Sequence, residues 1–317
     1  MNKILVIDLG GTSAKCAVFA DNKEMLLEFK VKTDITNILP NLKTAINEQL
    51  TTHQMLWSEI RAIGFALPGF LDDKTGVVTL ASNLGWKDFP IRQEAQALFQ
   101  KQIFIINDAN AAALGEFWNN SDQTIHSLAL YTLGTGIGGG LILNDQLWTG
   151  ATGYAGEFGH GGNFQNQFPC SCGLKNCIEP LSSATGLTKL INRKAKTAPN
   201  SSLGKLVQHQ RHPLGLGDIK PLLENNDQET IAVLEQGLEP LAQHIATLIY
   251  VINPALIILA GGVTNLGPEL LAIITRLVHR ATGEFLWKTF ELKISALQDK
   301  AGMYGAAYYA FKNLNLL

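Results

Sequence analysis

Two apolar strands in this sequence each run directly into a glycine-rich turn. Ile4 to Ile7 lead into DLGGT at residues 8–12, and a strand expected over residues 127–133 leads into GTGIGGG at residues 134–140. A further apolar segment follows each turn, as the return strand of a β-hairpin would. Because the pattern recurs, we predict two lobes of related build, each presenting one glycine turn to a shared cleft.

Further strand signals alternate with helical segments, which indicates an α/β architecture. Strands are expected over residues 62–66, 103–106 and 254–260, and an Ala-rich helix over residues 109–118. Residues 197–218 are rich in Pro, Ser, Asn and Gly, and we expect a surface excursion there.

The length of the chain supports division into two lobes. Its 317 residues, of which 46% are hydrophobic, exceed what one ordinary core requires. We expect a smaller lobe of residues 1–116, completed by a C-terminal helix over residues 300–317, and a larger lobe of residues 117–299. The uncharged stretch 245–268 is interrupted by Asn-Pro and Gly-Gly, so we interpret it as core rather than as a membrane span.

Glycine turns of this kind suit a phosphate group, because several backbone N–H groups can converge on it where no Cβ intervenes. An acidic residue before such a turn can hold hydrated Mg²⁺. Neither a P-loop nor a dinucleotide fingerprint followed by a helix is present. The alternative is a set of tight turns that bind nothing. The candidate residues are Asp8 for Mg²⁺ and, for phosphate, Gly10, Gly11, Thr12, Lys15, Gly134, Thr135, Gly136, Gly261 and Gly262.

Three of the four cysteines lie within eight residues, at Cys170, Cys172 and Cys177. No secretion signal is visible, and clustered cysteines in such a chain favour a metal site over disulfides. With His160 they form a Cys₃His set, which closes a tetrahedral Zn²⁺ and leaves no open position. We therefore predict structural zinc, the alternative being a core histidine and ordinary reduced thiols.

The dipeptide Asn107-Asp108 falls where a buried strand ends and a helix begins. In α/β proteins such positions often carry ligand groups, so Asp108 is a candidate proton acceptor in a phosphoryl transfer. From its position alone, Asp108 is better explained as the N-cap of the helix.

Together these motifs resemble the ROK family of sugar kinases and repressors. The resemblance covers nearly the whole chain, from DLGGT at residues 8–12, through NDAN at 107–110, to AGMYGAA at 301–307. Its most specific part is GEFGH at residues 156–160 followed by CSCGLKNCIE at 170–179. Two positions depart from the family pattern: Asn176 replaces a usual glycine, and Ser13 stands where some members have lysine. We expect the zinc loop to tolerate Asn176 because asparagine also adopts left-handed backbone.

The resemblance implies a two-lobed, actin-like (ribonuclease H-like) fold with an interlobe cleft, as in the actin, Hsp70 and hexokinase superfamily. It implies ATP and Mg²⁺ as cosubstrate and cofactor, with polyphosphate as the alternative phosphate donor, and it implies structural Zn²⁺ and Asp108 as the general base. The implied sugar ligands are Gly69, Asn83, Asn107, Glu157, His160 and Glu179.

Three classes of function compete for this sequence. The motif AGEFGH at residues 155–160 resembles the glucose and amino-sugar kinases of the family more than its fructose kinases. We expect glucose as the substrate, with N-acetylmannosamine and N-acetylglucosamine as alternatives. A sugar-responsive repressor would need a DNA-binding domain ahead of Asp8, where we expect no room for one. A zinc-ribbon interaction module leaves the glycine turns unexplained. The formal net charge of −2 and the absence of a basic run argue against nucleic acid as a partner. We expect a cytoplasmic homodimer that binds sugar and ATP and no membrane.

Overall fold

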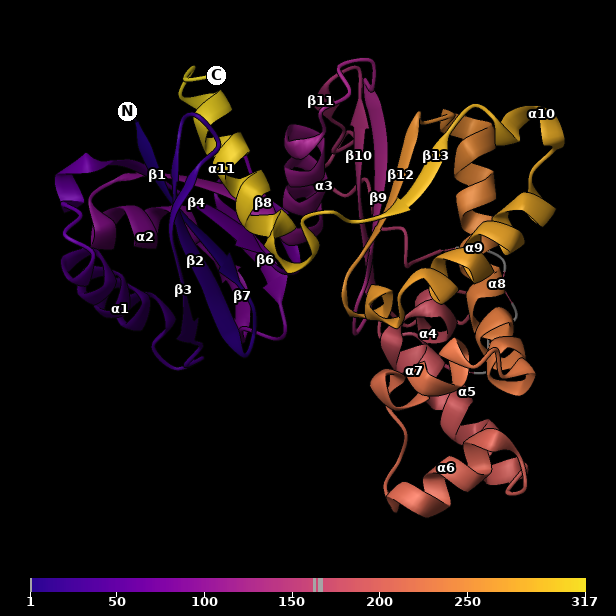
Figure 1. Cartoon of the computed structure of the whole chain (residues 1–317). Helices are drawn as coiled ribbons and strands as arrows, with labels where there is room; N and C mark the ends of the chain where they lie inside the picture. Colours follow the sequence, from indigo (N-terminus) through magenta and orange to yellow (C-terminus); the bar gives the residue numbers. More distant parts are fainter. Residues whose placement is uncertain (1, 162–163, 165–167) are drawn as a thin grey trace.

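The computed structural model describes residues 2–161, 164 and 168–317. The part described contains two five-stranded mixed sheets, one in each half of the chain (Figure 1). The predicted α/β architecture is therefore confirmed. Met1, Gly162, Asn163 and residues 165–167 belong to the predicted lobes but lie outside the described residues.

The first sheet has the strand order β3-β2-β1-β4-β8. Strands β1 to β3 form an antiparallel meander, while β4 and β8 run parallel to β1. Its strands are β1 (Lys3–Leu9), β2 (Ser13–Ala20), β3 (Met25–Lys32), β4 (Ile60–Leu67) and β8 (Gln102–Asn107). The same half of the chain contains α1 (Ile38–Thr52), the 3₁₀ turn Trp57–Glu59, α2 (Ile91–Phe99) and a small sheet of β5 (Phe70–Asp72), β6 (Val77–Ala81) and β7 (Trp86–Phe89).

The second sheet repeats this arrangement with the order β11-β10-β9-β12-β13. An antiparallel meander again begins the sheet, and two further strands again run parallel to its first strand. Its strands are β9 (Ser127–Leu133), β10 (Ile137–Leu143), β11 (Gln146–Leu147), β12 (Leu256–Ala260) and β13 (Glu291–Ile294). The two halves therefore share one topology, as the recurring strand and glycine turn predicted.

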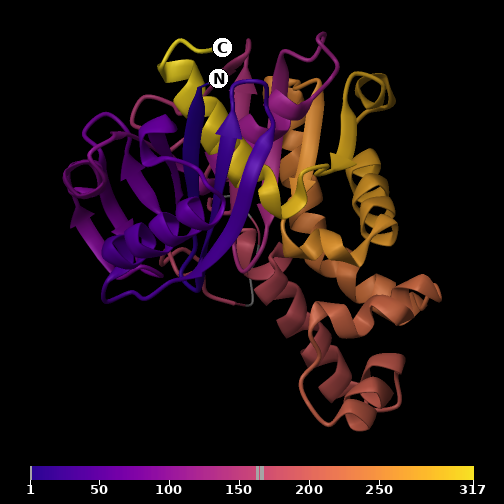
Figure 2. The same cartoon turned by 60° about the vertical axis from the view of Figure 1, so that its left-hand side comes forward.

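Helices of the second half pack on its sheet and extend below it (Figures 1 and 2). They are α4 (Glu179–Ser182), α5 (Ala184–Thr197), α6 (Ser202–Gln210), α7 (Leu216–Glu224), α8 (Gln228–Ile252), α9 (Pro268–Ala281) and α10 (Glu284–Trp287), with a 3₁₀ turn at Gly262–Leu266. Helix α6 lies in the predicted surface excursion, where the Ser201 hydroxyl caps it by accepting a hydrogen bond from the Gly204 N–H at 3.1 Å. The predicted surface excursion thus contains a helix, and its serine N-cap offsets the Pro- and Gly-rich composition.

The stretch with membrane-like length is part of the core. Helix α8 buries Leu238, Leu241 and Ile245, and every residue of β12 is buried. Among the helices that the structure describes, none has both the length and the apolar character needed to span a bilayer.

Two helices join the lobes: α3 (Asp108–Asn119) and α11 (Ala301–Asn313), which follows a 3₁₀ turn at Gln298–Lys300. They lie side by side between the two sheets and share a buried core with strands of both (Figure 1). A Cβ on Gly115 would collide with the backbone of Ala301, and one on Gly305 with that of Ala111. The two helices therefore cross in direct backbone contact, which only glycine allows.

Candidate active site

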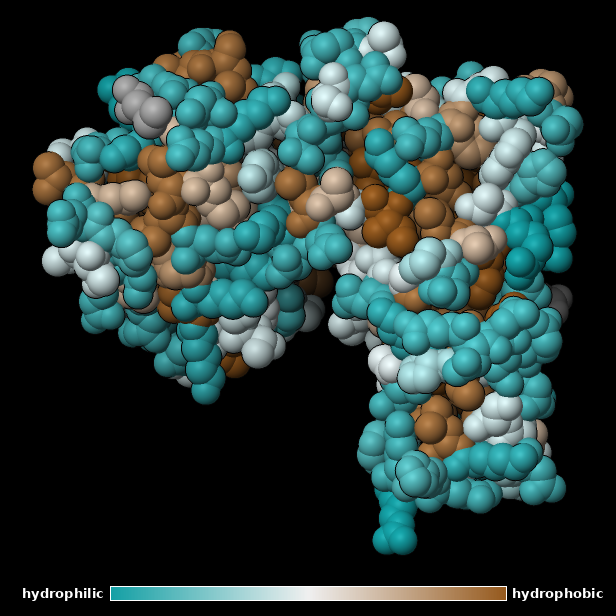
Figure 3. All heavy atoms as spheres, in the orientation of Figure 1, coloured by the Kyte–Doolittle hydropathy of each residue, from teal (hydrophilic) through white to brown (hydrophobic). Residues whose placement is uncertain are grey.

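A cleft of about 780 Å³ opens between the two sheets. On the face drawn in the space-filling view, the surface is recessed where the two lobes meet (Figure 3). Side chains and turns from both lobes line the cleft. The predicted site residues among them are Gly69, Asn83, Asn107, Asp108, Gly134, Thr135, Gly136, Glu157, His160, Glu179 and Gly261. Sequence reasoning missed others, such as Thr132 and Tyr154, because nothing in their local patterns marks them.

Strand β8 and helix α3 hold Asn107 and Asp108 at the base of the cleft. The Asn107 side-chain oxygen accepts hydrogen bonds from the N–H groups of Ala109 at 3.0 Å and Asn110 at 3.1 Å, so Asn107 is the N-cap. Its amide also donates to the Gly69 carbonyl at 3.1 Å. Asp108 is the first helical residue, and the capping alternative for it is wrong by one position. Its carboxylate accepts from the Ala109 N–H at 2.8 Å.

The environment of Asp108 favours a carboxyl group that titrates near neutrality. Its side chain is open to the cleft, but protein atoms surround it on the remaining sides. Burial raises its pKa to about 7, and the negative charges of Asp8 and Glu157 add to the rise. A carboxyl with this pKa can accept a proton and release it again near pH 7.

The first glycine turn lies next to the cleft rather than lining it. A Cβ on Gly11 would stand 2.8 Å from the Asn83 carbonyl, so Gly11 packs directly against a cleft residue. Gly10 closes the turn by donating from its N–H to the Ser13 carbonyl at 3.0 Å. Thr12 is exposed.

Asp8 lies one residue before the end of β1, beside this turn, and burial raises its pKa to about 6 although Lys15 opposes the rise. Lys15 does not point at an unpaired anion. Its ammonium contacts Asp299 just before α11, at 2.6 Å to the carbonyl and 3.1 Å to the carboxylate.

The second glycine turn lines the cleft and is supported from beneath. The Gly138 N–H donates to the Thr132 hydroxyl at 3.0 Å, which fixes the start of β10. Gly261 follows β12 with a φ of 92°, and a Cβ at this position would clash with the backbone of Leu133 at the end of β9. Gly262 is exposed and begins a 3₁₀ turn at the same edge.

The loop at residues 156–160 docks on β9 and α8 through an aromatic side chain. Phe158 packs against Tyr131, with ring centroids 4.7 Å apart, and against His244 at 5.4 Å. The buried Tyr131 hydroxyl forms a 2.9 Å hydrogen bond with Nδ1 of His244. Glu157 and His160 flank Phe158 in the chain and both line the cleft, so this anchor orients them. Sequence patterns gave no signal for Tyr131 or His244, because their partners lie far away along the chain.

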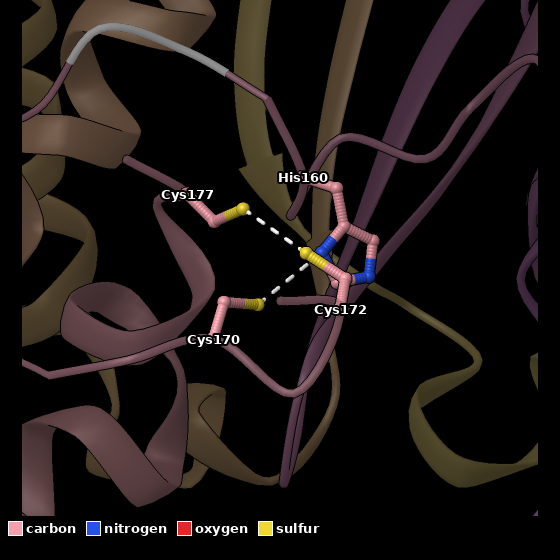
Figure 4. Close-up of side chains that lie close together, drawn as sticks. All are labelled: His160, Cys170, Cys172 and Cys177. Atoms are coloured by element: carbon pink, nitrogen blue, oxygen red, sulfur yellow. Dashed lines mark hydrogen bonds between the residues drawn. The ribbon is translucent and has the colours of Figure 1, made fainter. Parts of the chain in front are cut away.

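The four predicted zinc ligands converge (Figure 4). Their ligand atoms all lie within 4.8 Å of one another, with Cys170 Sγ 3.5 Å from His160 Nδ1 and Cys172 Sγ 3.5 Å from Cys177 Sγ. Tetrahedral Zn²⁺ holds such atoms roughly 3.6–3.8 Å apart, so the donor set and its spacing fit the metal.

The substituted position in the zinc loop needs no glycine. Asn176 is not among the described residues with positive φ, whereas Gly173 has φ of 88°. The expectation of left-handed backbone at Asn176 was therefore wrong, and Gly173 takes that conformation instead.

Comparison with known proteins decides the family. The ROK family model matches residues 4–313. The chain belongs to the ROK family. A glucokinase of Halalkalibacterium halodurans is 30% identical to this ROK protein over 95% of the chain and 93% of its own length. An N-acetyl-D-glucosamine kinase of Pasteurella multocida is 29% identical over 81% and 83%. The xylose repressor of Caldicellulosiruptor bescii is 27% identical over 96% of the chain and 77% of its own length.

A solved structure of a ROK family glucokinase from Streptomyces griseus, in complex with glucose and AMPPNP, superposes with a TM-score of 0.80. It is 26% identical and covers 97% of this ROK protein and 98% of its own chain. The predicted actin-like fold and the predicted enzyme class, a sugar kinase, are thereby confirmed.

Proposed function

We propose that this protein phosphorylates a hexose hydroxyl with ATP, and that its substrate is glucose. The observation that carries the proposal is the shared cleft: Asp108, Glu157, His160 and Glu179 line the same cavity as the turn at residues 134–136. A carboxylate able to accept a proton therefore faces groups suited to sugar hydroxyls and backbone suited to phosphate.

In the proposed reaction, Asp108 accepts the proton of the attacking sugar hydroxyl. The hydroxyl oxygen forms the new bond to the γ-phosphorus while the bond from that phosphorus to the bridging oxygen of ADP breaks. The electron pair leaves with ADP, and Asp108 later returns its proton to water. Glu157, His160 and Glu179 would orient the sugar, with Asn83, Gly69 and the second amide hydrogen of Asn107 as further contacts.

Asp8 is the residue proposed to hold Mg²⁺. The negative charge of Asp8 helps to raise the pKa of Asp108, and the nearby cation Lys15 is already paired with Asp299. A divalent cation fits this uncompensated negative charge, and when bound it would neutralise charge on the phosphates. The ATP phosphates would contact the turns at residues 10–12 and 134–136, with Gly261 and Gly262 at the rim and Lys15 available once it leaves Asp299.

The proposed zinc is structural. His160 and the cysteines at 170, 172 and 177 would hold it, and it would tie the loop of Glu157 to the loop before Glu179. We also propose that residues 1–116 with 300–317, and residues 117–299, close on the substrates as two lobes and exclude water from the cleft. The protein is further proposed to be a homodimer, which light scattering of the purified protein tests.

Two alternatives remain for the function. The N-acetylglucosamine kinase among the relatives favours an amino-sugar substrate, and the xylose repressor favours a regulatory sugar sensor. One assay separates them: ADP release measured over glucose, mannose, N-acetylmannosamine, N-acetylglucosamine, fructose and allose. The highest kcat/KM on glucose supports the proposal, and the highest value on an N-acetyl sugar replaces glucose as substrate. Sugar binding without ADP release would refute the kinase and favour the sensor.

A further inference from the structure

The segment at residues 179–185 holds the second glycine turn at successive points. The Glu179 carboxylate accepts a hydrogen bond from the Ile137 N–H at 2.9 Å. The Ala184 N–H donates to the Gly134 carbonyl at 2.8 Å. The Thr185 hydroxyl donates to the Thr135 carbonyl at 2.8 Å. The turn proposed to bind ATP phosphate is thus fastened from outside by the chain that leaves the zinc loop.

Glu179 contacts both sides of this junction. One carboxylate oxygen takes the Ile137 N–H, while the other lies 3.8 Å from Cys170 Sγ in the zinc loop. Its own N–H donates to the Gly159 carbonyl, between Phe158 and His160, at 3.1 Å. Glu179 therefore contacts the zinc loop and the glycine turn through its half-buried side chain, and the loop proposed to bind sugar through its backbone.

Glu179 packs directly against the glycine turn. A Cβ on Gly136 would collide with the Glu179 carboxylate, so this glycine and this glutamate are packed directly together. The backbone of Gly136 does not have positive φ, so the carboxylate, rather than backbone strain, excludes a side chain there. The position of the Glu179 carboxylate therefore bears on the turn through this contact and through the hydrogen bond from Ile137.

We propose that sugar binding and nucleotide binding are energetically coupled through residues 179–185, with Glu179 as the positioning residue of the nucleotide turn. This inference rests on the proposed kinase function. A sugar that hydrogen-bonds to Glu179 immobilises its carboxylate and, through Ile137, the turn. The nucleotide then meets a turn that is already ordered and binds more tightly, and linkage requires the same factor in the reverse direction.

The experiment measures the affinity of AMPPNP by calorimetry, with and without saturating glucose. The wild-type protein should bind AMPPNP several-fold more tightly when glucose is present. Glu179→Ala should abolish that difference and weaken AMPPNP binding about tenfold even without glucose, because a hydrogen bond to a charged acceptor is lost. Glu179→Gln should recover part of the affinity, since its amide oxygen can still accept from Ile137.

Thr185 provides a matched variant away from the sugar. Thr185→Val removes only the contact to Thr135, and we expect it to weaken AMPPNP binding two- to fivefold while glucose affinity stays unchanged. Thr185→Ser keeps the hydroxyl and should behave as wild type. Circular dichroism verifies that each variant is folded.

Failure of this inference differs from failure of the proposed function. If the protein is an active kinase but its AMPPNP affinity is the same with and without glucose, the proposed coupling is refuted. A Glu179→Ala variant that loses glucose affinity alone and retains wild-type AMPPNP affinity also refutes the coupling. Absence of ADP release with every sugar would instead remove the kinase function.

Discussion

Replacing Asp108 by asparagine separates catalysis from stability more sharply than any other change in the cleft. Asn107 is the N-cap of α3, so the variant keeps the cap and the shape of the side chain. It removes the proposed proton acceptor. We expect kcat to fall by roughly 10²–10⁴-fold, with a much smaller change in sugar affinity.

The same substitution should stabilise the fold at alkaline pH. The pKa of Asp108 is raised from 3.8 to about 7, so the folded protein binds a proton that the unfolded chain has already released between these values. Stability contributed by the protonated form is full below about pH 4 and is lost as pH rises through about 7. Unscreened, the shift corresponds to ~4 kcal/mol. Because the side chain is open to the cleft, we expect about 1 kcal/mol after solvent screening.

Both effects are measured on one pair of proteins. Coupled ADP release at pH 6 to 9 should give a wild-type kcat/KM that rises with an apparent pKa near 7, because the base must be ionised. Thermal melts at pH 8 should place the Asp108→Asn variant about 2 °C above wild type, and the gain should disappear near pH 4. Unimpaired turnover in the variant would refute the assignment of the base. A lower melting temperature at pH 8 would refute the electrostatic argument.

Three further changes test other parts of the structure. Cys172→Ser should lose the zinc, about one ion per chain by elemental analysis, and should raise the sugar KM; wild-type activity in metal-free protein would contradict the link to the sugar loop. Gly305→Ala should destabilise the protein by ~1–3 kcal/mol in denaturant melts, because its Cβ meets the Ala111 backbone, and an unchanged midpoint would contradict the close helix crossing. Tyr131→Phe should lower the free energy of unfolding by ~1–3 kcal/mol, because it removes the hydrogen-bond partner of His244, and it should raise the sugar KM. An equal loss of sugar and ATP affinity would argue against a role confined to the sugar loop.

Local patterns predicted the features that depend on neighbours in the chain. The strands before the glycine turns and the proposed zinc ligands follow from short spacings, and the structure brings those four side chains together. The N-cap was misplaced by one residue, because helix boundaries depend on which of two adjacent polar side chains turns inward. The partner of Lys15 is Asp299, 284 residues away in the sequence, and no local pattern indicates this pairing. The contacts of Glu179 with the turn at Ile137 depend on packing across the lobe and were invisible for the same reason.

The repeated topology explains why the proposed metal and base belong to one side of the cleft. In the first hairpin Asp8 is paired with Lys15, one step before the turn; the equivalent pair in the second hairpin is Thr132 with Gly138. The second lobe thus has an uncharged hydroxyl that supports its own backbone where the first has a carboxylate.

The last parallel strands of the two sheets, β8 and β13, also differ in the residue that follows each of them. Strand β8 leads into Asp108 at the cleft, whereas β13 leads into Ser295, which is buried and donates to the Glu116 carboxylate of α3. The end of β8 therefore supplies an acid to the cleft. The residue after β13 instead hydrogen-bonds to α3, one of the two helices that join the lobes. A duplicated scaffold alone would place two equivalent turns around a substrate. Divergence at these few positions leaves Asp8 and Asp108 on the first lobe, so a cation and the proton acceptor would meet the phosphoryl group from that side, while the second lobe would bind it through the backbone of its glycine turn.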